Sequence, residues 1–215
     1  MENKKIMVIA PHAKDEVLGC GGYLLHNKGC QKLIAVATIG DKEDGGQYDT
    51  RLAEFKDVCT RLGAIGVTLS YTGEGTGLES VSGFKLTARL NELINSFKPT
   101  EIFVSAPDNH QDGNKLYVCA MAALPIWGDY HPKRIFLYEY PFTTQPSDRP
   151  DCGRVYHDIT DVIDDKVKLF NSYGSQVKDA PSPYNERGIK ALANVRGLES
   201  GYDFTEMYYL QKMIL

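Results

Sequence analysis

The residues best suited to chemistry lie in one short stretch near the start of the chain. His12, Asp15 and Glu16 follow the apolar run 6–10 almost directly. An imidazole and a carboxylate three residues apart, on a turn after a strand, can be directed at one divalent cation. Glu16 is better placed to hold this turn, by accepting hydrogen bonds from backbone amides or by supporting a metal ligand. Lys14 adds an ammonium group to the same turn, and its charge opposes the binding of a cation.

A second group of such residues follows the apolar run 101–105. The loop 106–114 carries His110, Asp112 and Asn114. A catalytic zinc ion has about three protein ligands of the His, Asp, Glu or Cys type and an open position for water. Because α/β proteins bind ligands at the carboxyl ends of their parallel strands, we expect this loop to supply a further ligand to the first turn.

Alternating apolar runs and segments of helical period predict strands joined by helices. The predicted strands cover 5–10, 33–38, 67–71, 101–105 and 134–140. The predicted helices cover 16–28, 49–62, 84–97, 115–124, 161–173 and 185–196. We predict loops over 40–48 and 142–155, and a C-terminal tail, 202–215, that packs on the body of the protein. This order of elements predicts a three-layer α/β sandwich with a strongly twisted, mostly parallel sheet.

Length and composition favour one globular domain over residues 1–215. The chain is 42% hydrophobic and 24% charged, which is enough for one sizeable core. A net charge of -4 and a pI near 5.7 argue against nucleic acid or anionic lipid as a partner. The apolar run 6–10 is too short for a signal segment or a membrane span, so we expect a cytoplasmic protein. Five cysteines without C-x-x-C spacing are typical of reduced thiols.

The first stretch resembles a known signature. Residues 11–22 are similar to the Pro-His-Pro-Asp-Asp-Glu-x-x-Gly-x-Gly-Gly motif of the LmbE-like deacetylases, the PIG-L type of N-acetylglucosaminyl deacetylase. The resemblance extends nearly end to end. Further segments that resemble the family are Arg51-x-x-Glu54, Leu62-Gly63, Tyr138-Glu139-Tyr140, Asp158-Ile159-Thr160, Lys166, Tyr173-x-Ser175-Gln176, Arg196-Gly197 and Gly201-Tyr202-x-x-x-Glu206.

This resemblance implies a zinc hydrolase with a Rossmann-like fold that removes the acetyl group from an amino sugar or a glycoconjugate. By the resemblance, His12 and Asp15 match two metal ligands, and His110 matches the histidine that stabilises the oxyanion. Arg51 lies near the start of a predicted helix, where it could bind a sugar hydroxyl or a phosphate. A salt bridge between Arg51 and a nearby acid, Glu54 or Asp49, is the alternative.

Two positions depart from the family in a way that affects its chemistry. The general-base aspartate of the family falls at Lys14, and its third metal ligand, a histidine, falls at Gly113. A positioned base contributes roughly 10²- to 10⁴-fold in rate. A charged lysine about 5 Å from zinc would cost roughly 7 kcal/mol at an effective dielectric near 20. Only His12 and Asp15 remain as ligands unless Asp112, Asn114 or His110 moves in, and two ligands make a poor zinc site.

We therefore predict a weak or inactive deacetylase, in which the Lys14 ammonium occupies the space of the lost cation by pairing with Asp15 or Glu16. If the chain is catalytic, metal-activated water would attack the acetamide carbonyl, and Glu16 or Asp112 would have to serve as the base. The alternatives are a non-catalytic module that binds a sugar or a partner enzyme, and a metal-independent activity that uses Lys14 as an amine nucleophile or base. A deliberate substitution at Lys14 or Gly113 would also explain the departures.

Overall fold

The computed structural model describes residues 4–40, 47–69, 77–78, 80–125, 127, 129–141 and 152–215. The strands are β1 (Lys5–His12), β2 (Gln31–Thr38), β3 (Ala64–Thr68), β4 (Glu101–Ser105), β5 (Arg134–Tyr138), β6 (Arg154–Asp158) and β7 (Thr205–Met213). The helices are α1 (Asp15–His26), α2 (Gln47–Leu62), α3 (Gly83–Phe97), α4 (Gln111–Ala123), α5 (Ile163–Asn171) and α6 (Glu186–Ser200), with a short 3-10 turn, η1 (Gly174–Gln176).

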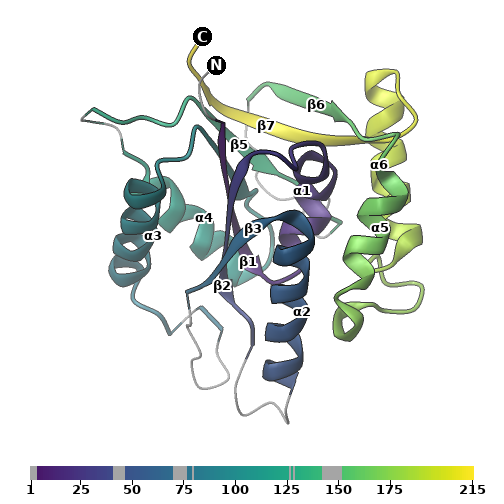
Figure 1. Ribbon diagram of the computed structural model, residues 1–215, viewed down its shortest axis with the longest axis horizontal. Helices are drawn as coiled ribbons and strands as arrows, with labels where there is room; N and C mark the ends of the chain where they lie inside the picture. The colour runs from purple at the N-terminus through teal and green to yellow at the C-terminus, as the bar shows by residue number, and fades with distance from the viewer. Residues whose placement is uncertain are drawn as a thin grey trace.

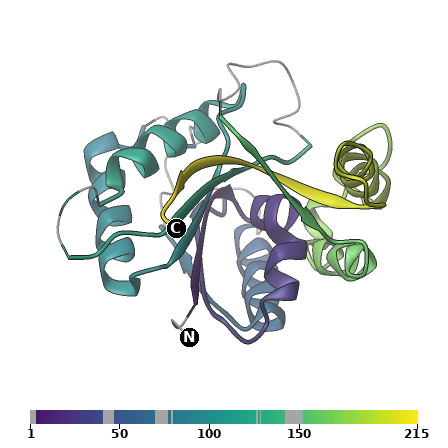
Figure 2. The same ribbon diagram turned by 90° about the horizontal axis from the view of Figure 1, so that it is seen from above.

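The described strands form one seven-stranded sheet between two layers of helices. Helices α3 and α4 cover one face, whereas α1, α2, α5 and α6 cover the other (Figures 1 and 2). Each face buries its own apolar cluster, in which Leu86 and Leu116 represent one layer and Val17 and Phe55 the other. The predicted three-layer α/β fold is therefore confirmed.

The order of the strands places a topological switch point beside β1. The sheet runs β3-β2-β1-β4-β5-β7-β6, so that β1 pairs in parallel with β2 on one side and with β4 on the other. The chain leaves these two neighbouring strands toward opposite sides, and a crevice opens between their carboxyl ends. His12 ends β1, and the loop 106–110 follows β4. The two stretches that carry the chemical groups therefore meet at this edge of the sheet.

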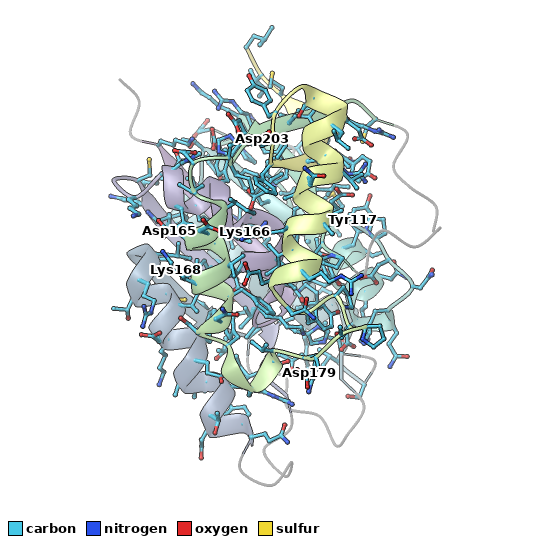
Figure 3. All side chains as sticks on the ribbon, turned by 90° about the vertical axis from the view of Figure 1, so that its right-hand side faces the viewer. Tyr117, Asp165, Lys166, Lys168, Asp179 and Asp203 are labelled. Atoms are coloured by element: carbon cyan, nitrogen blue, oxygen red, sulfur yellow. The ribbon has the colours of Figure 1, made fainter. Side chains whose placement is uncertain are left out.

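Helix α1 is fixed against the sheet by close packing and by a buried ion pair. A Cβ atom on Gly19 would lie only 2.1 Å from the ring of Tyr138, so only glycine lets the helix approach β5 this closely. Lys166 of α5 donates to the Leu18 carbonyl at 2.8 Å and to Glu206 of β7 at 2.7 Å. Figure 3 shows Lys166 in the region between α5 and α6. The helix that carries Asp15 thus has little freedom to move.

Several predicted boundaries are wrong for identifiable reasons. Strand β3 starts earlier than the predicted strand 67–71, because Gly63 at φ 60° ends α2 and lets the chain turn at once. Helix α4 begins at Gln111 rather than Lys115, since the His110 side chain caps it. Strands β6 and β7 were not predicted. The tail does pack on the body, as expected, but it does so as β7, which runs antiparallel to both β5 and β6.

Three further sequence expectations concern the loops, the cysteines and membrane-spanning segments. The predicted loops 40–48 and 142–155 fall largely on 41–46 and 142–151, which lie outside the described residues. All five cysteines are free thiols. Among the helices that the structure describes, none combines the length and the apolar character needed to cross a membrane.

Candidate active site

The turn between β1 and α1 brings His12 and Asp15 into direct contact. Asp15 Oδ2 accepts a hydrogen bond from the His12 backbone N–H at 3.2 Å and lies 3.2 Å from His12 Nδ1. Between them, Lys14 has φ 108° and ψ -33°, a backbone conformation that residues other than glycine rarely adopt. Such strain persists only where the surrounding structure holds it, and it concentrates at functional sites.

Glu16 is the residue that holds this strained turn. Its Oε2 accepts from the Lys14 backbone N–H at 2.9 Å, and its Oε1 accepts from the hydroxyl of Tyr173. The Glu16 side chain is fully buried. Burial raises the pKa of its carboxyl to about 7, against the opposing effect of the hydrogen bond from Tyr173. Because both oxygens are engaged beneath the turn, Glu16 is poorly placed to take a proton from a substrate or a water in the crevice.

The first turn of α4, directly after the loop that follows β4, brings a carboxylate to the same histidine. Asp112 Oδ2 lies 3.0 Å from His12 Nε2, although the two residues are 100 positions apart in the chain. The other oxygen, Oδ1, accepts from the backbone N–H of Leu78 at 2.7 Å. His12 is therefore bridged between two carboxylates, one from each of the stretches identified in the sequence.

This bridge sets the charge of His12. Burial lowers its pKa, but hydrogen bonds to Asp112 and Asp15 outweigh burial, so the pKa lies above the ordinary value of 6.5. For Asp15, burial raises the pKa, while the charge of Lys14 and the contacts with His12 lower it more, and the net shift is downward. Both shifts favour the charged forms of His12 and Asp15, and the Lys14 ammonium lies close to Asp15.

His110 lies at the exposed mouth of the crevice with a defined tautomer. Its Nδ1 accepts from the Asp112 backbone N–H at 3.2 Å, which caps α4. Its ring stands edge-on to that of His12, with 5.2 Å between the centroids. Because Nδ1 is the acceptor, the neutral ring carries its proton on Nε2. That N–H suits donation to a developing oxyanion better than coordination of a metal.

Three of these groups could together hold a metal ion. One ligand atom each from His12, His110 and Asp112 lies within 4.8 Å of the others. Imidazole nitrogens and a carboxylate oxygen are the donors that zinc prefers. Asp15 adds a second feature, because its buried Oδ1 accepts no hydrogen bond from any residue that the structure describes. The charged group near that oxygen is the Lys14 ammonium, with its Nζ 3.6 Å away.

The first half of the chain also matches a family model. Residues 7–124 match PIG-L, described as GlcNAc-PI de-N-acetylase. The chain belongs to this family. The resemblance to LmbE-like deacetylases is thereby confirmed, whereas no curated protein matches the chain.

Solved structures share the PIG-L fold over nearly the whole chain. The conserved protein TT1542 from Thermus thermophilus is 25% identical, with a TM-score of 0.76 over 98% of this chain and 96% of its own. N,N'-diacetylchitobiose deacetylase from Pyrococcus horikoshii, complexed with its inhibitor MPG, is 20% identical, with a TM-score of 0.76 over 98% and 84%. The 4-carboxy-2-hydroxymuconate hydratase GalB from Pseudomonas putida KT2440 is 16% identical, with a TM-score of 0.77 over 99% and 98%. Because one of these structures is a deacetylase and another is a hydratase, the fold alone does not determine the reaction, which depends on the residues of the site.

In this PIG-L protein, the space beside Gly113 is taken by Asp108, a residue for which the sequence predicts no role. A Cβ atom on Gly113 would lie 2.6 Å from Asp108 Oδ1. Asp108 is buried, and its carboxylate accepts from the His110 backbone N–H at 2.7 Å and from the Tyr140 hydroxyl at 2.6 Å. A histidine at position 113 therefore requires Asp108 to move. The acid in the loop after β4 was visible in the sequence, but its packing against Gly113 was not.

Two hollows share His12 and Lys14 in their linings, and we call the two together the cleft. The larger hollow, of about 200 Å³, is lined by Lys14, His12 and Asp15 together with His110, Tyr140 and Tyr184. The smaller, of about 100 Å³, is lined by Lys14 and His12 together with Arg51, Tyr173 and Gln176. The Lys14 side chain is 12% exposed, and its Nζ lies 5.3 Å from the centroid of the Tyr184 ring. The ammonium thus lies inside the cleft.

Arg51 reaches the cleft from the first half of α2. Its Nη2 donates to Gln47 Oε1 at 2.6 Å, and its Nη1 lies against the backbone of Gly40, where a Cβ atom would approach it to 2.5 Å. Glu54, one turn further along α2, accepts from the N–H and the hydroxyl of Ser175 at 2.7 and 2.6 Å. The structure therefore places Arg51 in the same cleft as His12, a predicted metal ligand. The hydrogen bonds of Glu54 connect α2 to η1 beside this cleft.

Proposed function

We propose that this protein is an amino-sugar de-N-acetylase homologue whose hydrolytic activity is weak or absent. The observation that carries the proposal is the position of the Lys14 ammonium, inside the cleft and 3.6 Å from Asp15 Oδ1. An ammonium beside the carboxylate of a metal ligand competes with a cation for that carboxylate. The same residue stands where the family resemblance implies an aspartate that accepts a proton.

The remaining donors would hold a metal ion only weakly. His12 and Asp15 would be two ligands, and Asp112 would be the third after giving up its contact with His12 Nε2. A bound divalent ion polarises a carbonyl oxygen and makes water nucleophilic at neutral pH. Zinc is thus the cofactor that the family implies, and we propose that this protein binds it at low occupancy.

The residues of the chain divide the remaining catalytic roles unequally. His110 would donate its Nε2 proton to the oxyanion that forms at the acetamide carbonyl. Among the described residues around His110, none is well placed to act as the general base. Lys14 cannot accept a proton while it is charged, Glu16 is held beneath the turn, and both oxygens of Asp112 have hydrogen-bonding partners. Substrate binding therefore has better support than turnover.

The substrate class that fits the cleft is an N-acetylated amino sugar or a small glycoconjugate. Among the similar structures, one is named a deacetylase of N,N'-diacetylchitobiose. The tyrosines of the larger hollow, Tyr140 and Tyr184, have the amphipathic character suited to a sugar face. Five free cysteines are consistent with a reducing compartment, and we place the protein in the cytoplasm on that ground.

Metal content and acetate release together test this function. The protein would be purified without chelator and analysed for zinc, and then incubated with N-acetylglucosamine or N,N'-diacetylchitobiose while acetate is measured. We expect less than stoichiometric zinc and little or no acetate. Stoichiometric zinc accompanied by deacetylation of either substrate would sink the proposal. The variant Lys14→Asp, which supplies a carboxylate at the base position, is expected to release more acetate than the unaltered protein when zinc is added.

A non-catalytic binding module is the second candidate. The observation that favours it is that the cleft offers two hollows, of about 100 and 200 Å³, around the Lys14 that stands at the family's base position. Calorimetry with amino sugars on metal-free protein separates the two functions. Saccharide binding without acetate release supports the module, whereas a weak deacetylase releases acetate in proportion to the zinc supplied.

A further inference from the structure

Helix α6 has apolar residues on two opposite faces. Its inner face packs on the body of the protein and buries Ile189, Ala193 and Gly197. Its outer face carries Val195 and Leu198, which are 50% and 77% exposed. A surface helix of a globular protein normally combines one apolar face with a polar face toward solvent. The outer face of α6 departs from this pattern, because apolar residues occupy the side that faces solvent.

The apolar residues of the outer face form a stripe. Ala191, Val195 and Leu198 fall within an arc of about 60° at 3.6 residues per turn. Tyr202, just beyond the end of the helix, is 54% exposed. We call these four residues the α6 stripe. Helices α5 and α6 form the flank of the molecule that faces the viewer in Figure 3. Single exposed apolar residues are common on protein surfaces, whereas a group of them on one face is typical of an interaction site.

Opposite charges stand at the two ends of the α6 stripe. Arg187 lies on the first turn of the helix and Asp203 follows its last turn, and both residues are exposed. Neither side chain has an ion-pair partner among the residues that the structure describes. Other charged residues of the helix are already paired, since Lys190 contacts Asp164 and Glu186, and Glu199 contacts Arg196. The helix therefore presents a cation at one end and an anion at the other.

We propose that the α6 stripe is the contact surface of a homodimer, in which α6 of one protomer packs antiparallel on α6 of the other. Arg187 lies as far before Val195 in the sequence as Asp203 lies after it. A two-fold axis at Val195 therefore brings Arg187 of each protomer to Asp203 of the other. The same axis places Leu198 opposite the small side chain of Ala191. A two-fold contact must be self-complementary, and the α6 stripe meets this condition in both charge and side-chain size.

The size of the contact predicts a weak dimer. Helix α6 has 15 residues and is about 22 Å long. A standard stable interface buries roughly 800 Å² per partner, which is more than the exposed surface of the four residues of the stripe. Antiparallel packing also brings the positive end of one helix dipole to the negative end of the other, which adds a small attraction. The dimer should therefore form only at high protein concentration.

Sedimentation velocity at protein concentrations from about 1 µM to about 0.5 mM tests the proposal on the whole chain. We expect the sedimentation coefficient to rise with concentration from that of a monomer toward that of a dimer. Leu198→Glu, which puts a charge in the middle of the stripe, should leave a monomer at every concentration. Phe84→Glu is the matched control, because Phe84 is 83% exposed on α3, which covers the other face of the sheet (Figure 1). This control should associate as the unaltered protein does.

Charge reversal at the two ends tests the antiparallel arrangement. Arg187→Glu and Asp203→Arg each place like charges together at both ends of the dimer. Each should raise the dissociation constant by about two- to thirtyfold, the effect of losing two exposed ion pairs. The double variant, Arg187→Glu with Asp203→Arg, restores opposite charges, and its dissociation constant should return close to that of the unaltered protein.

Three results overturn the proposal. A monomer over the whole concentration range would assign the α6 stripe to a different partner. Association of Leu198→Glu as strong as that of the unaltered protein, with an unchanged melting temperature, would assign the dimer to another surface. A double variant that dimerises no better than the two single variants would refute the antiparallel arrangement. None of these measurements depends on zinc content or acetate release.

Discussion

Replacing Lys14 by methionine should raise the affinity of the cleft for zinc. The ammonium of Lys14 lies 3.6 Å from Asp15 Oδ1, an oxygen of a predicted metal ligand. A zinc ion bonded to that oxygen at about 2.1 Å cannot be more than about 6 Å from the ammonium in its present position. Methionine keeps much of the length and the apolar stem of lysine but removes the charge.

The magnitude follows from Coulomb's law. Two charges on zinc and one on lysine repel by roughly 6 kcal/mol at about 6 Å and an effective dielectric near 20. The flexible lysine stem can carry the ammonium toward solvent, which recovers much of this energy. We therefore expect a gain of at least about 1.4 kcal/mol, or tenfold in affinity, for Lys14→Met.

The assay is a competition titration. Metal-free protein and a chromophoric zinc chelator share a limiting amount of zinc, and the absorbance reports how the ion is divided. Lys14→Arg keeps the charge and should match the unaltered protein, as should Lys168→Met, whose charge lies on the exposed side of α5. If Lys14→Met binds zinc no more tightly than these two controls, the charge of Lys14 does not govern metal affinity and the electrostatic reasoning is refuted.

Three further predictions concern stability. Lys166→Met leaves the buried carboxylate of Glu206 without its cation, which should cost about 3–5 kcal/mol in chemical denaturation. Gly19→Ala introduces a Cβ 2.1 Å from the Tyr138 ring, and we expect a loss of about 1–3 kcal/mol in the same assay. Burial lowers the pKa of His157 below its ordinary value of 6.5, so the unfolded chain takes up a proton at higher pH than the folded protein does. The stability that the neutral His157 side chain contributes is therefore present above pH 6.5 and is lost as the pH falls below 6.5. His157→Gln should therefore show a smaller drop in melting temperature than the unaltered protein between about pH 7.5 and about pH 5.

The parts of the fold that the sequence predicts well are those whose pattern is local. Strand β1 is a continuous apolar run between polar residues, and α1 repeats its apolar residues at helical spacing. Strands β6 and β7 escaped prediction for the opposite reason. Strand β6 lies at the edge of the sheet with half-exposed polar residues, and β7 is stabilised by antiparallel pairing with two strands distant in sequence. Their stability comes from neighbours that no sequence window contains.

The candidate site divides in the same way. Which groups take part could be read from residue types placed after apolar runs, and His12, Asp15, His110 and Asp112 do lie together. The hydrogen bonds and packing that connect these groups could not be predicted from the sequence. The hydrogen bond from His12 Nε2 to Asp112 and the packing of Asp108 against Gly113 depend on side-chain directions that only the assembled loops define.

The sequence by itself determined the family, the α/β class and the presence of an ammonium in a turn of metal-binding type, because these depend on residue identity and local spacing. The tertiary structure decided where that ammonium lies. Lys14 could have turned to solvent, but the turn held by Glu16 places it in the linings of two hollows, one shared with Asp15 and the other with Arg51. The electrostatic character of a cleft is a sum over charges brought together by folding, and such a sum is set by distances that the order of residues does not contain.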